Sequence, residues 1–471
     1  MKRKSNMLLI SLMVITSMVL TACGGEQAAS PTATTAPVAE QATNTPAAME
    51  QATNTPEAMV KETPTGAGMA GEFDPSKVKK LDVESGATLR VSGWGNPSEQ
   101  QVTRDMLDRF TKVYPDVKIN YEPIPDDYTT KLKTQISGGS EPDVFYVDAV
   151  LADELIDSSK LLKLNDSMTA AGVKKSDYYD ALINIFSRGD DVYGLPKDFG
   201  TLATFYNTEM VKSPPKDNWT WNDFKAWAQE NTSGTDPNSK VYGTMLLPDN
   251  ARFLAFALAN GVKIVKDDKT TDINSPEAIE ALDFYYGMVK EGMAAGSAED
   301  LSVGWPGEAF GKKRIASALE GGWMVPFLAD PKGGYGDVKY TAAPLPQSNK
   351  GGKGNLLFTN AYSASANTKY QKAAAALVNF LAGTENQREV LKIGFALPTI
   401  KGFEGDAYFK DHPVDAVLFD SLNYGTVHYF GKNHGKILDS INNALKSVYS
   451  GSADSKTALD NAAAEINDLL K

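Results

Sequence analysis

The hydrophobic positions between residues 85 and 160 change their spacing in a regular way. Three short runs rich in branched and aromatic residues predict strands over Thr88–Ser92, Val117–Tyr121 and Val144–Val147. Each run is followed by a stretch in which apolar residues recur three or four positions apart, the spacing of one helix face. These predicted helices are Glu99–Val113, Tyr128–Ile136 and Leu151–Ile156. Strands that alternate with helices in this way form a parallel sheet with right-handed crossovers.

Helical spacing, interleaved with short apolar strands, continues to the end of the chain. The folded part contains about 390 residues, more than one hydrophobic core usually serves, so the sequence predicts an α/β fold divided into two lobes. The further predicted helices are Trp221–Glu230, Pro276–Glu291, Gln371–Leu381, Lys436–Tyr449 and Ala458–Leu470.

The N-terminal end has the pattern of an export signal. Basic residues at positions 2–4 precede the apolar run Met7–Leu20, and no acidic residue occurs in residues 1–22. The run is too short to span a bilayer, which needs about 20 apolar residues, so we expect cleavage after residue 22. Residues 20–23 read LTAC, which matches the bacterial lipobox. A thiolate there can accept a diacylglycerol, and because Cys23 is the only cysteine, we predict that it is the lipidation site.

Residues 23–71 have a composition that cannot form a core. They are rich in Ala, Thr, Pro, Gln and Met, and the ten-residue unit EQATNTPAAM at Glu40 is followed by EQATNTPEAM at Glu50. Such a segment predicts a disordered stalk, whose copying is tolerated because only its reach matters. We therefore expect an extracytoplasmic protein anchored to the cell membrane as a lipoprotein.

Charge and motifs exclude several function classes. The formal net charge is −12, and removal of the three cations in residues 1–22 makes it −15, which excludes nucleic acid as a partner. The sequence lacks zinc-protease, nucleophile-elbow, phosphate-loop and EF-hand motifs. Its three histidines, His412, His428 and His434, have no metal-site spacing. We predict neither an enzyme nor a cofactor or metal site, although paired carboxylates leave a carbohydrate-degrading enzyme as an alternative.

Aromatic residues follow several predicted strands and glycine pairs. Sugars present flat apolar faces ringed by hydroxyls, so a sugar site needs aromatic plates together with Asp, Asn or backbone groups. Trp94 stands between two glycines, and Trp323 follows two more, which favours a role at a ligand over simple packing. Trp305 precedes a proline and fits a helix start equally well. Asp148 could instead cap the following helix, and Asp198 could be a turn residue.

Seven segments together resemble the extracellular solute-binding proteins of ABC importers, family 1, which includes the maltose-binding proteins. Their order and spacing along the chain carry the resemblance. The segments are LRVSGWGN from Leu89, GGSEPDVFYVDA from Gly138, GLPKDFGTLATFYNTEMV from Gly194, FGKKRIASALEGGW from Phe310, APLPQ from Ala343, AYSAS from Ala361 and ALPTI from Ala396.

The resemblance implies a two-lobed periplasmic-binding-protein-like fold of type II, with a hinge that the chain crosses three times. The crossings are expected near Asp198–Thr204, near Leu356–Asn360 and near Gly383. The N-terminal lobe would then contain residues 84–198 and 360–382. The C-terminal lobe would contain residues 203–355 and 386–471.

The resemblance also implies which residues face a ligand between the lobes. Because no arginine stands at the implied positions, a neutral or amino-bearing sugar is favoured over an anionic one. Tyr429 takes the place where the family often has arginine or tryptophan. The implied ligand-binding residues are Trp94, Asp148, Asp198, Gly200, Thr201, Gly322, Trp323, Asn360, Tyr362 and Tyr429.

The predicted function is capture of a carbohydrate, a neutral mono- or oligosaccharide, and its delivery to the permease of an ABC transporter. Besides the permease subunits and the membrane that holds the lipid, we expect no partner, and the protein is expected to be monomeric. Two alternatives stay open. The same fold could bind a phosphate ester, a polyamine or a small peptide, or the chain could be a surface enzyme that degrades carbohydrate.

Overall fold

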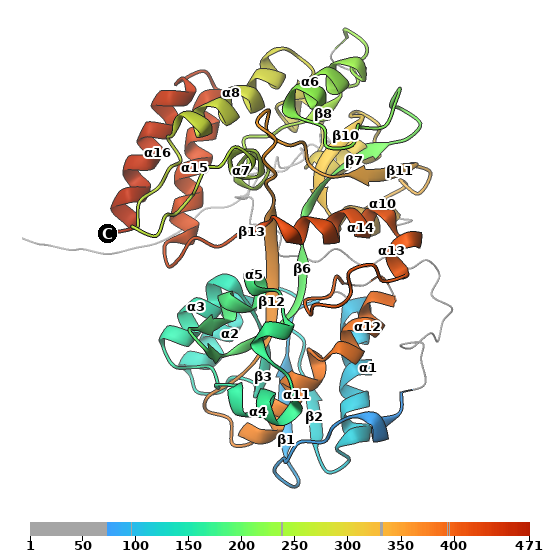
Figure 1. The fold of residues 1–471 in the computed structure, drawn as a ribbon, viewed down its shortest axis with the longest axis vertical. Coiled ribbons are helices and arrows are strands. Elements are labelled where there is room, and N and C mark those ends of the chain that lie inside the picture. The colour runs from blue at the N-terminus through green and yellow to red at the C-terminus, as the bar shows by residue number, and fades with distance from the viewer. Residues whose placement is uncertain (1–72, 96, 237–238, 330–332, 393, 395) are drawn as a thin grey trace, which may run out of the picture. The chain divides into compact units, whose positions relative to one another are not determined.

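The computed structural model describes residues 73–471, apart from 96, 237–238, 330–332, 393 and 395 (Figure 1). All of the described residues belong to one compact unit of the chain. The predicted signal peptide of residues 1–22, the lipidation site Cys23 and the stalk of residues 23–71 lie outside the described residues. Within the described part, no helix combines the length and the apolar character that crossing a membrane requires.

A six-stranded sheet, the first sheet, forms one part of this unit. Strand β1 is parallel to both β2 and β3, which confirms the predicted alternation of parallel strands and helices. Strand β12 is antiparallel to β3 on one side and to β6 on the other, and its first residues also pair with β13. The strands are β1 (Thr88–Ser92), β2 (Lys118–Tyr121), β3 (Val144–Asp148), β6 (Gly194–Gly200), β12 (Leu356–Ala364) and β13 (Thr426–Val427).

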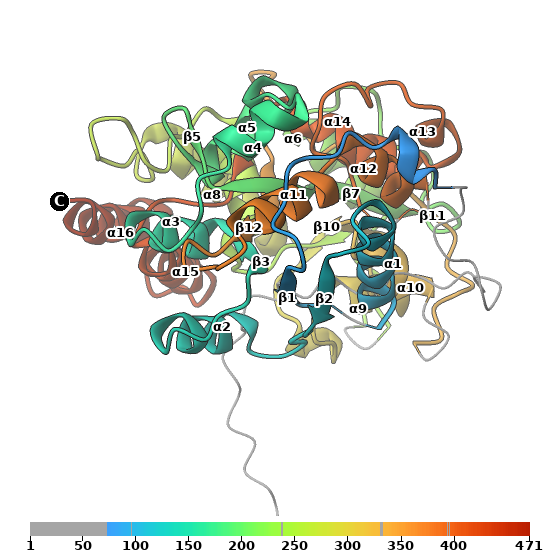
Figure 2. The same ribbon diagram turned by 90° about the horizontal axis from the view of Figure 1, so that it is seen from below.

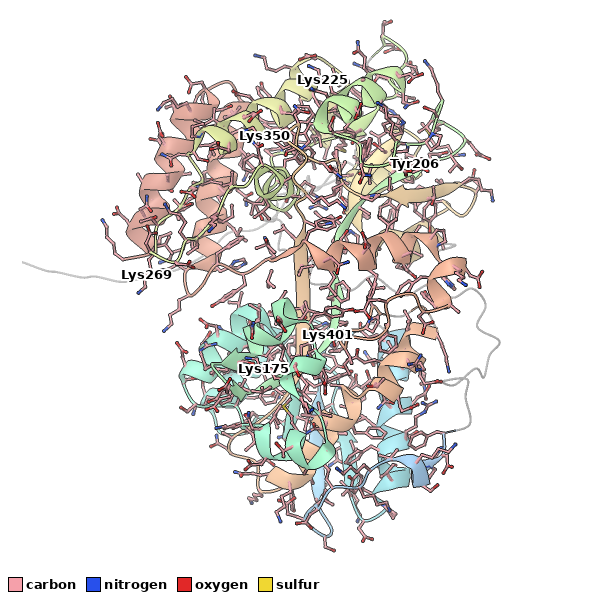
Figure 3. All side chains as sticks on the ribbon, in the orientation of Figure 1. Lys175, Tyr206, Lys225, Lys269, Lys350 and Lys401 are labelled. Atoms are coloured by element: carbon pink, nitrogen blue, oxygen red, sulfur yellow. The ribbon has the colours of Figure 1, made fainter. Side chains whose placement is uncertain are left out.

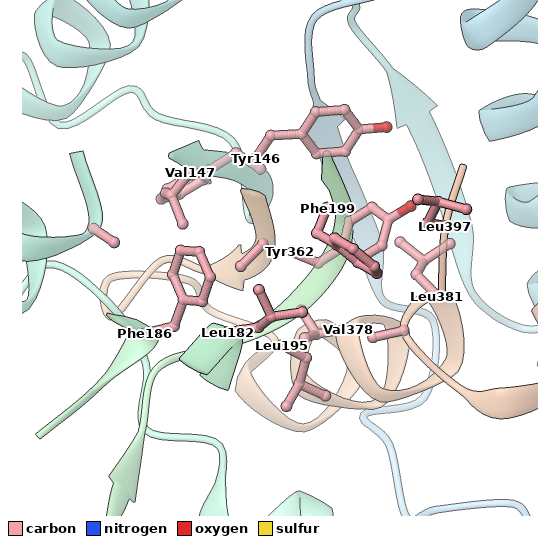
Figure 4. Close-up of a cluster of buried hydrophobic side chains, with 14 of the residues drawn as sticks. Tyr146, Val147, Leu182, Phe186, Leu195, Phe199, Tyr362, Val378, Leu381 and Leu397 are labelled. Carbon is pink, nitrogen blue, oxygen red and sulfur yellow. The ribbon is translucent and has the colours of Figure 1, made fainter. Parts of the chain in front are cut away.

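Helices cover the first sheet (Figure 2). The apolar side chains between the sheet and these helices are buried. Helix α11 packs on β6 and β12, and its run of four alanines, 373–376, is buried, so the helix backbone comes close to the sheet. Figure 4 shows Val378 and Leu381 of α11 beside Leu195 and Tyr362 in this core. The helices are α1 (Pro97–Val113), α2 (Tyr128–Ser137), α3 (Ala149–Asp157), α4 (Asn165–Ala171), α5 (Asp180–Ile183), α11 (Gln371–Leu381) and α12 (Thr384–Lys392).

The second sheet has three antiparallel strands, with β7 (Leu202–Asn207) between β10 (Ser317–Gly321) and β11 (Tyr340–Ala343). A capping box at Thr220 and Asp223 fixes the start of one covering helix. The helices of this part are α6 (Trp221–Glu230), α7 (Asn250–Ala259), α8 (Pro276–Lys290), α9 (Pro306–Gly311), α10 (Met324–Ala329), α13 (Tyr408–Asp411), α14 (Pro413–Asp420), α15 (His434–Tyr449) and α16 (Ser455–Leu469). Two short strand pairs complete the fold: β4 (Ser187–Arg188) with β5 (Asp191–Val192), and β8 (Thr244–Met245) with β9 (Ala294–Ala295).

The predicted helices are confirmed, most of them to within two residues at each end. Helices α6 and α11 have the predicted bounds, and α8 ends one residue earlier than predicted. Trp305 stands at the N-cap of α9, which agrees with the interpretation of this residue as a helix start. The apolar periodicity was strong in these segments, and helix existence is the part of a fold that such periodicity determines best.

The segment after Gly383 differs from the expectation. Residues 386–471 were assigned to the second lobe, but helix α12 and residues 396–401 contact elements of the first sheet. Glu389 Oε2 lies 3.7 Å from Arg109 Nη2 of α1, and the Thr399 hydroxyl donates to the Pro196 carbonyl at 2.7 Å. Helix α14, by contrast, packs on β11 and β7. These contacts place the passage of the chain from the first sheet to the second between residues 401 and 413. The sequence did not predict this, because an apolar pattern marks where a helix ends and not which sheet the helix covers.

Candidate functional site

Three of the implied ligand-binding residues lie side by side across the first sheet. In the register of β12, Asn360 stands opposite Asp148 of β3 on one side and opposite Asp198 of β6 on the other. The Asn360 amide donates to Asp198 Oδ1 at 3.2 Å. We call Asp148, Asn360 and Asp198 the polar row. The row places two carboxylates and one amide, the groups that hydrogen-bond sugar hydroxyls, at the ends of β3 and β6.

Asp148 is also a helix cap. Its Oδ1 accepts a hydrogen bond from the Leu151 N–H at 2.7 Å, at the start of α3. The capping alternative considered for this residue is therefore confirmed. Burial raises the pKa of the Asp148 carboxyl, and the backbone N–H groups of Val150 and Leu151 oppose that rise.

A β-bulge beside the polar row brings in a residue that the sequence analysis missed. Asn360 stands opposite Asp198 and the next residue, Ala361, stands opposite Pro196, so Lys197 is an extra residue in β6. A bulge turns neighbouring side chains toward the same face, which a regular strand does not. Accordingly, Lys197 Nζ forms an ion pair with Asp198 Oδ2. The GLPKDFG segment contains the Lys-Asp pair, but no sequence signal marks the bulge.

Lys197 is buried, unlike Lys269, an exposed lysine that is labelled in Figure 3. Its side chain is 6% exposed, and its Nζ lies 3.5 Å from Oε1 of Glu99, a side chain that is 1% exposed. Burial alone would lower the pKa of Lys197, but the carboxylates of Asp198 and Glu99 raise it above the ordinary value. The ammonium is thus held between two carboxylates, an arrangement in which removal of one member leaves a buried charge uncompensated.

Aromatic rings surround this charged cluster. Trp94 packs edge to face on Tyr128 and Tyr146, with ring centroids 4.9 and 5.2 Å apart, and Tyr146 packs on Tyr362 at 5.3 Å. A Cβ at Gly93 would lie 2.4 Å from the Tyr146 ring, so this glycine serves close ring packing. Tyr362 is only 3% exposed, and burial raises its pKa.

Lys197 and Tyr362 also line a small pocket within the first part of the molecule. Its other walls are mostly apolar side chains from α1, α11, α12 and residues 396–398. In Figure 4, Leu381 and Leu397 lie next to Tyr362 on this side of the core. Such walls lack the convergent hydroxyl-binding groups of a sugar site, so the polar row remains the better candidate.

Trp323, the aromatic plate that the resemblance implies for the second lobe, lies beside the second sheet. It follows β10, and its Nε1–H donates to Glu320 Oε2 at 2.8 Å. Its ring packs edge to face on Phe358 of β12, with centroids 6.0 Å apart. A Cβ at Gly321 would lie 2.3 Å from the indole, so the glycine before Gly322 accommodates Trp323 itself.

The sequence analysis did not identify Phe358 and His428 as residues of the aromatic group around Trp323. Phe358 stands opposite Gly200 in the register of β12 and β6, and its ring lies 5.2 Å from that of His428. His428 Nε2 lies 3.1 Å from Asn250 Oδ1, and burial lowers the pKa of His428 to about 3. Phe358 lies two residues before Asn360, so one strand connects the aromatic group to the polar row.

Thr201 and Tyr429 occupy different surroundings. Thr201 is fully buried and donates its hydroxyl to the Leu418 carbonyl at 2.7 Å. Burial raises the pKa of Tyr429, and so does the neighbouring carboxylate of Asp153 in α3. The same two segments are joined by an ion pair, since Lys432 Nζ lies 2.6 Å from Oδ2 of Asp157 in α3. The role of both residues in ligand binding stays a prediction.

The sequence of this chain matches the model of the bacterial extracellular solute-binding protein family over residues 95–388. The chain belongs to this family. This match confirms the family that the resemblance implied. Proteins of this family bind solutes outside the cytoplasm.

Relatives and solved structures agree with this family. A galactooligosaccharide-binding protein of Bacillus subtilis is 25% identical over 397 residues, which cover 80% of this chain and 89% of its own length. A maltotriose-binding protein of Pyrococcus abyssi is 28% identical over 281 residues, covering 56% of this chain and 55% of the other. An ABC substrate-binding protein of Listeria monocytogenes in complex with cycloalternan has a TM-score of 0.70 and 26% identity, covering 81% and 98% of the two chains.

The fold is likewise that of the sugar-binding protein MalE from Xanthomonas citri, with a TM-score of 0.70 and 19% identity, covering 82% and 97% of the two chains. The predicted α/β periplasmic-binding-protein fold is therefore confirmed. The family is a solute-binding one, which agrees with the prediction of a binding protein rather than an enzyme. Among the described residues, no group of three or more His, Cys, Asp or Glu could hold a metal ion.

The solute-binding protein has one cation close to Trp323 that the sequence analysis missed. Arg252, near the start of α7, lies 2.6 Å from Glu320 Oε2 and 2.9 Å from Asp249 Oδ1. Burial alone would lower the pKa of this guanidinium, but Glu320 and Asp249 raise it. We expected no arginine near the site, and this one is matched by two carboxylates. Its presence therefore adds no net positive charge for an anionic ligand.

Proposed function

We propose that this solute-binding protein captures a neutral mono- or oligosaccharide and delivers it to the permease of an ABC transporter. The observation that carries the proposal is the placement of β12, which links the polar row at Asn360 to the ring of Phe358, against which Trp323 packs. Amide and carboxylate groups suit the rim of a sugar, and an indole suits its flat face. The names of its relatives, which bind maltotriose and galactooligosaccharide, support the same ligand class.

The balance of charge favours an uncharged ligand. Lys197 is matched by Glu99 and Asp198, and Arg252 by Asp249 and Glu320, so each cluster has one more carboxylate than cation. An anionic sugar or a phosphate ester would meet net negative charge and lose its hydration without a free cation to replace it. We therefore place neutral sugars first and amino-bearing sugars second.

The proposed mechanism is closure of two lobes on the sugar. Strand β6 belongs to the first sheet and β7 to the second, so the connection at residues 200–202 is one hinge segment. Strand β12 supplies the second, and residues 401–413 supply the third, in place of the segment near Gly383. A sugar that contacts both lobes stabilises the closed state, since only differential affinity for that state shifts the equilibrium.

The N-terminal segment supports a membrane-anchored form of the protein. Cys23 would carry the lipid after removal of residues 1–22, and residues 23–71 would be the tether. A flexible chain of this length would span roughly 35 to 40 Å. It would keep the domain near its permease and raise its effective concentration there. Metabolic labelling with a fatty acid tests this part, since Cys23→Ala should abolish the label.

The ligand class is tested by calorimetric titration of the unliganded protein. The panel contains maltotriose, maltotetraose, a galactooligosaccharide and an arabinooligosaccharide, with a glycerol phosphodiester, a polyamine and a tripeptide as non-sugar controls. Saturable binding of one neutral sugar without release of product supports the proposal. Binding of a non-sugar control alone overturns the ligand class, and product release overturns the absence of enzymatic activity.

A further inference from the structure

One carboxylate oxygen holds two different side chains next to the aromatic plate. Glu320 Oε2 accepts the indole N–H of Trp323 at 2.8 Å and a guanidinium N–H of Arg252 at 2.6 Å. The Glu320 side chain is wholly buried. Hydrogen bonds to charged groups are stronger than neutral ones, and burial strengthens them further, so this oxygen is a firm anchor for the indole.

The cation of this group is itself fixed from three directions. Besides Glu320, Arg252 contacts Asp249 Oδ1 at 2.9 Å, and its Nε–H donates to the Leu319 carbonyl at 3.4 Å. Asp249 is the N-cap of α7 and accepts the backbone N–H of Arg252. The anchor of the indole is therefore connected to the start of a helix and to β10, two rigid elements.

The indole ring is also confined by its neighbours. It lies against Gly321, where a Cβ would come within 2.3 Å of the ring, and Phe358 packs on it at 6.0 Å. Trp323 contacts both hydrophobic core clusters while remaining partly exposed. Rotation of the ring would break the hydrogen bond to Glu320 and bring the indole into Gly321 or Phe358.

We infer that Glu320 is a positioning residue, which together with Arg252 fixes the plane of the Trp323 indole so that a ring face, and no polar atom, is offered to the ligand. The single donor of the indole is used internally, so Trp323 binds by stacking alone. This inference rests on the proposed function, because a fixed ring face gains affinity only if the ligand has a flat apolar face. A preorganised ring lowers the entropy lost on binding.

The experiment compares two neutral replacements of similar size, Glu320→Gln and Glu320→Met. The amide of the first still accepts the indole N–H, whereas the thioether of the second is only a weak acceptor. Both leave Arg252 paired with Asp249. Glu320→Met also removes the acceptor that Arg252 has at Glu320, so the Trp323→Phe background is used to separate the effect on the indole from the effect on Arg252. The readouts are the indole N–H resonance of Trp323 in nitrogen-15 spectra, assigned with Trp323→Phe, its hydrogen-exchange rate, and the affinity for maltotriose.

We expect Glu320→Met to move the Trp323 indole resonance, to speed its exchange, and to weaken maltotriose binding about tenfold. Glu320→Gln should stay within about threefold of the wild type in affinity, because it retains an acceptor. In the Trp323→Phe background, Glu320→Met should cause no further loss, since the residue acts through the indole. A merely structural role would lower the affinity equally in both backgrounds.

Two results would overturn the inference. One is an equal loss of affinity from Glu320→Met with and without Trp323, and the other is a wild-type indole N–H that exchanges as fast as an exposed one. The second measurement needs only the wild type and the assignment variant Trp323→Phe, so it can overturn the inference even if Glu320→Met does not fold. It also needs no sugar, so absence of sugar binding by the wild type would refute the proposed function without touching the test of the indole.

Discussion

The two groups that face the proposed ligand are built on the same charged arrangement but use it differently. Beside the polar row, Lys197 lies between Glu99 and Asp198, and beside Trp323, Arg252 lies between Asp249 and Glu320. In the first group the Asp198 side chain is 14% exposed and stands next to Asn360, so a carboxylate is presented. In the second group the carboxylate of Glu320 is wholly buried and holds an aromatic ring.

This difference teaches that one charge pattern can serve two kinds of recognition. In the proposed site, the first group would offer hydrogen-bond acceptors to sugar hydroxyls, which give orientation and specificity. The second would offer a ring face, which gives contact area, while the indole N–H is already bonded to Glu320. In both groups the cation is paired with two carboxylates of the protein, so neither cation is available to bind an anionic ligand.

The largest expected effect is on stability, at Lys197. Lys197→Met leaves Glu99 buried without its ammonium, so we expect a loss of about 3 to 5 kcal/mol in the free energy of unfolding. Urea denaturation followed by circular dichroism measures it. The double variant Glu99→Gln with Lys197→Met should recover a large part of the loss, and Lys269→Met, at an exposed lysine, should change stability by less than about 0.5 kcal/mol. An unchanged midpoint in Lys197→Met would mean that the first charged group is not structural.

The second prediction concerns pH and distinguishes the two groups, because histidines adjoin only the aromatic one. Burial lowers the pKa of His428 to about 3 and that of His434 to about 4, whereas the ordinary value is 6.5. Between these values the unfolded chain binds protons that the folded chain does not. The contribution of His428 and His434 to the free energy of unfolding is therefore complete above about pH 6.5. It is lost progressively as the pH falls toward 4 and then 3.

Urea midpoints between pH 7.5 and 4 measure this loss, which we expect to amount to a few kcal/mol in total. His428→Gln keeps a polar side chain near Asn250 and removes one titrating group, so its stability should fall less steeply over the same interval. Equal slopes in the variant and the wild type would show that other groups set the pH dependence.

The third prediction removes the aromatic plate. Trp323→Ala should weaken binding of the preferred sugar by about 1 to 3 kcal/mol, because a stacked ring is lost, while the chain still folds. Calorimetry gives the affinity and thermal unfolding reports the fold. Trp227→Phe is the matched control. Trp227 is a buried tryptophan of α6 that is not among the predicted ligand-binding residues, so the variant should leave the affinity unchanged. Unaltered affinity in Trp323→Ala would place the platform elsewhere.

The smallest expected effect is at the polar row. Asp198→Asn retains an acceptor for hydroxyls, so a neutral sugar should lose only about 0.5 to 1.5 kcal/mol of binding energy. An amino-bearing sugar should lose more than its neutral counterpart, because a carboxylate near its ammonium is removed. Titration with the two sugars measures the difference, and equal losses would contradict the role of net negative charge in selecting the ligand.

Much of the architecture could be predicted because it is local. The apolar spacing in Thr88–Ser92 and in the helix ending at Val113 is a property of neighbouring residues, and the structure has both elements where the pattern predicts them. Asp148, Asn360 and Asp198, which were each selected from the sequence, lie together in the register of β12, and their role at a ligand stays a prediction. Lys197 beside them, and Phe358, Arg252 and Glu320 beside Trp323, were not selected.

The sequence by itself determined most of the elements and the family, and it singled out aromatic and acidic residues as candidates for the ligand site. Only the tertiary structure decided which of them share a surface, because register is a property of paired strands. A single extra residue in β6 turned Lys197 toward Asp198, and a contact between α7 and β10 brought Arg252 to Glu320, the acceptor of the Trp323 indole. Likewise, Glu389 of α12 and Thr399 contact elements of the first sheet, and no periodicity along the chain contains that information.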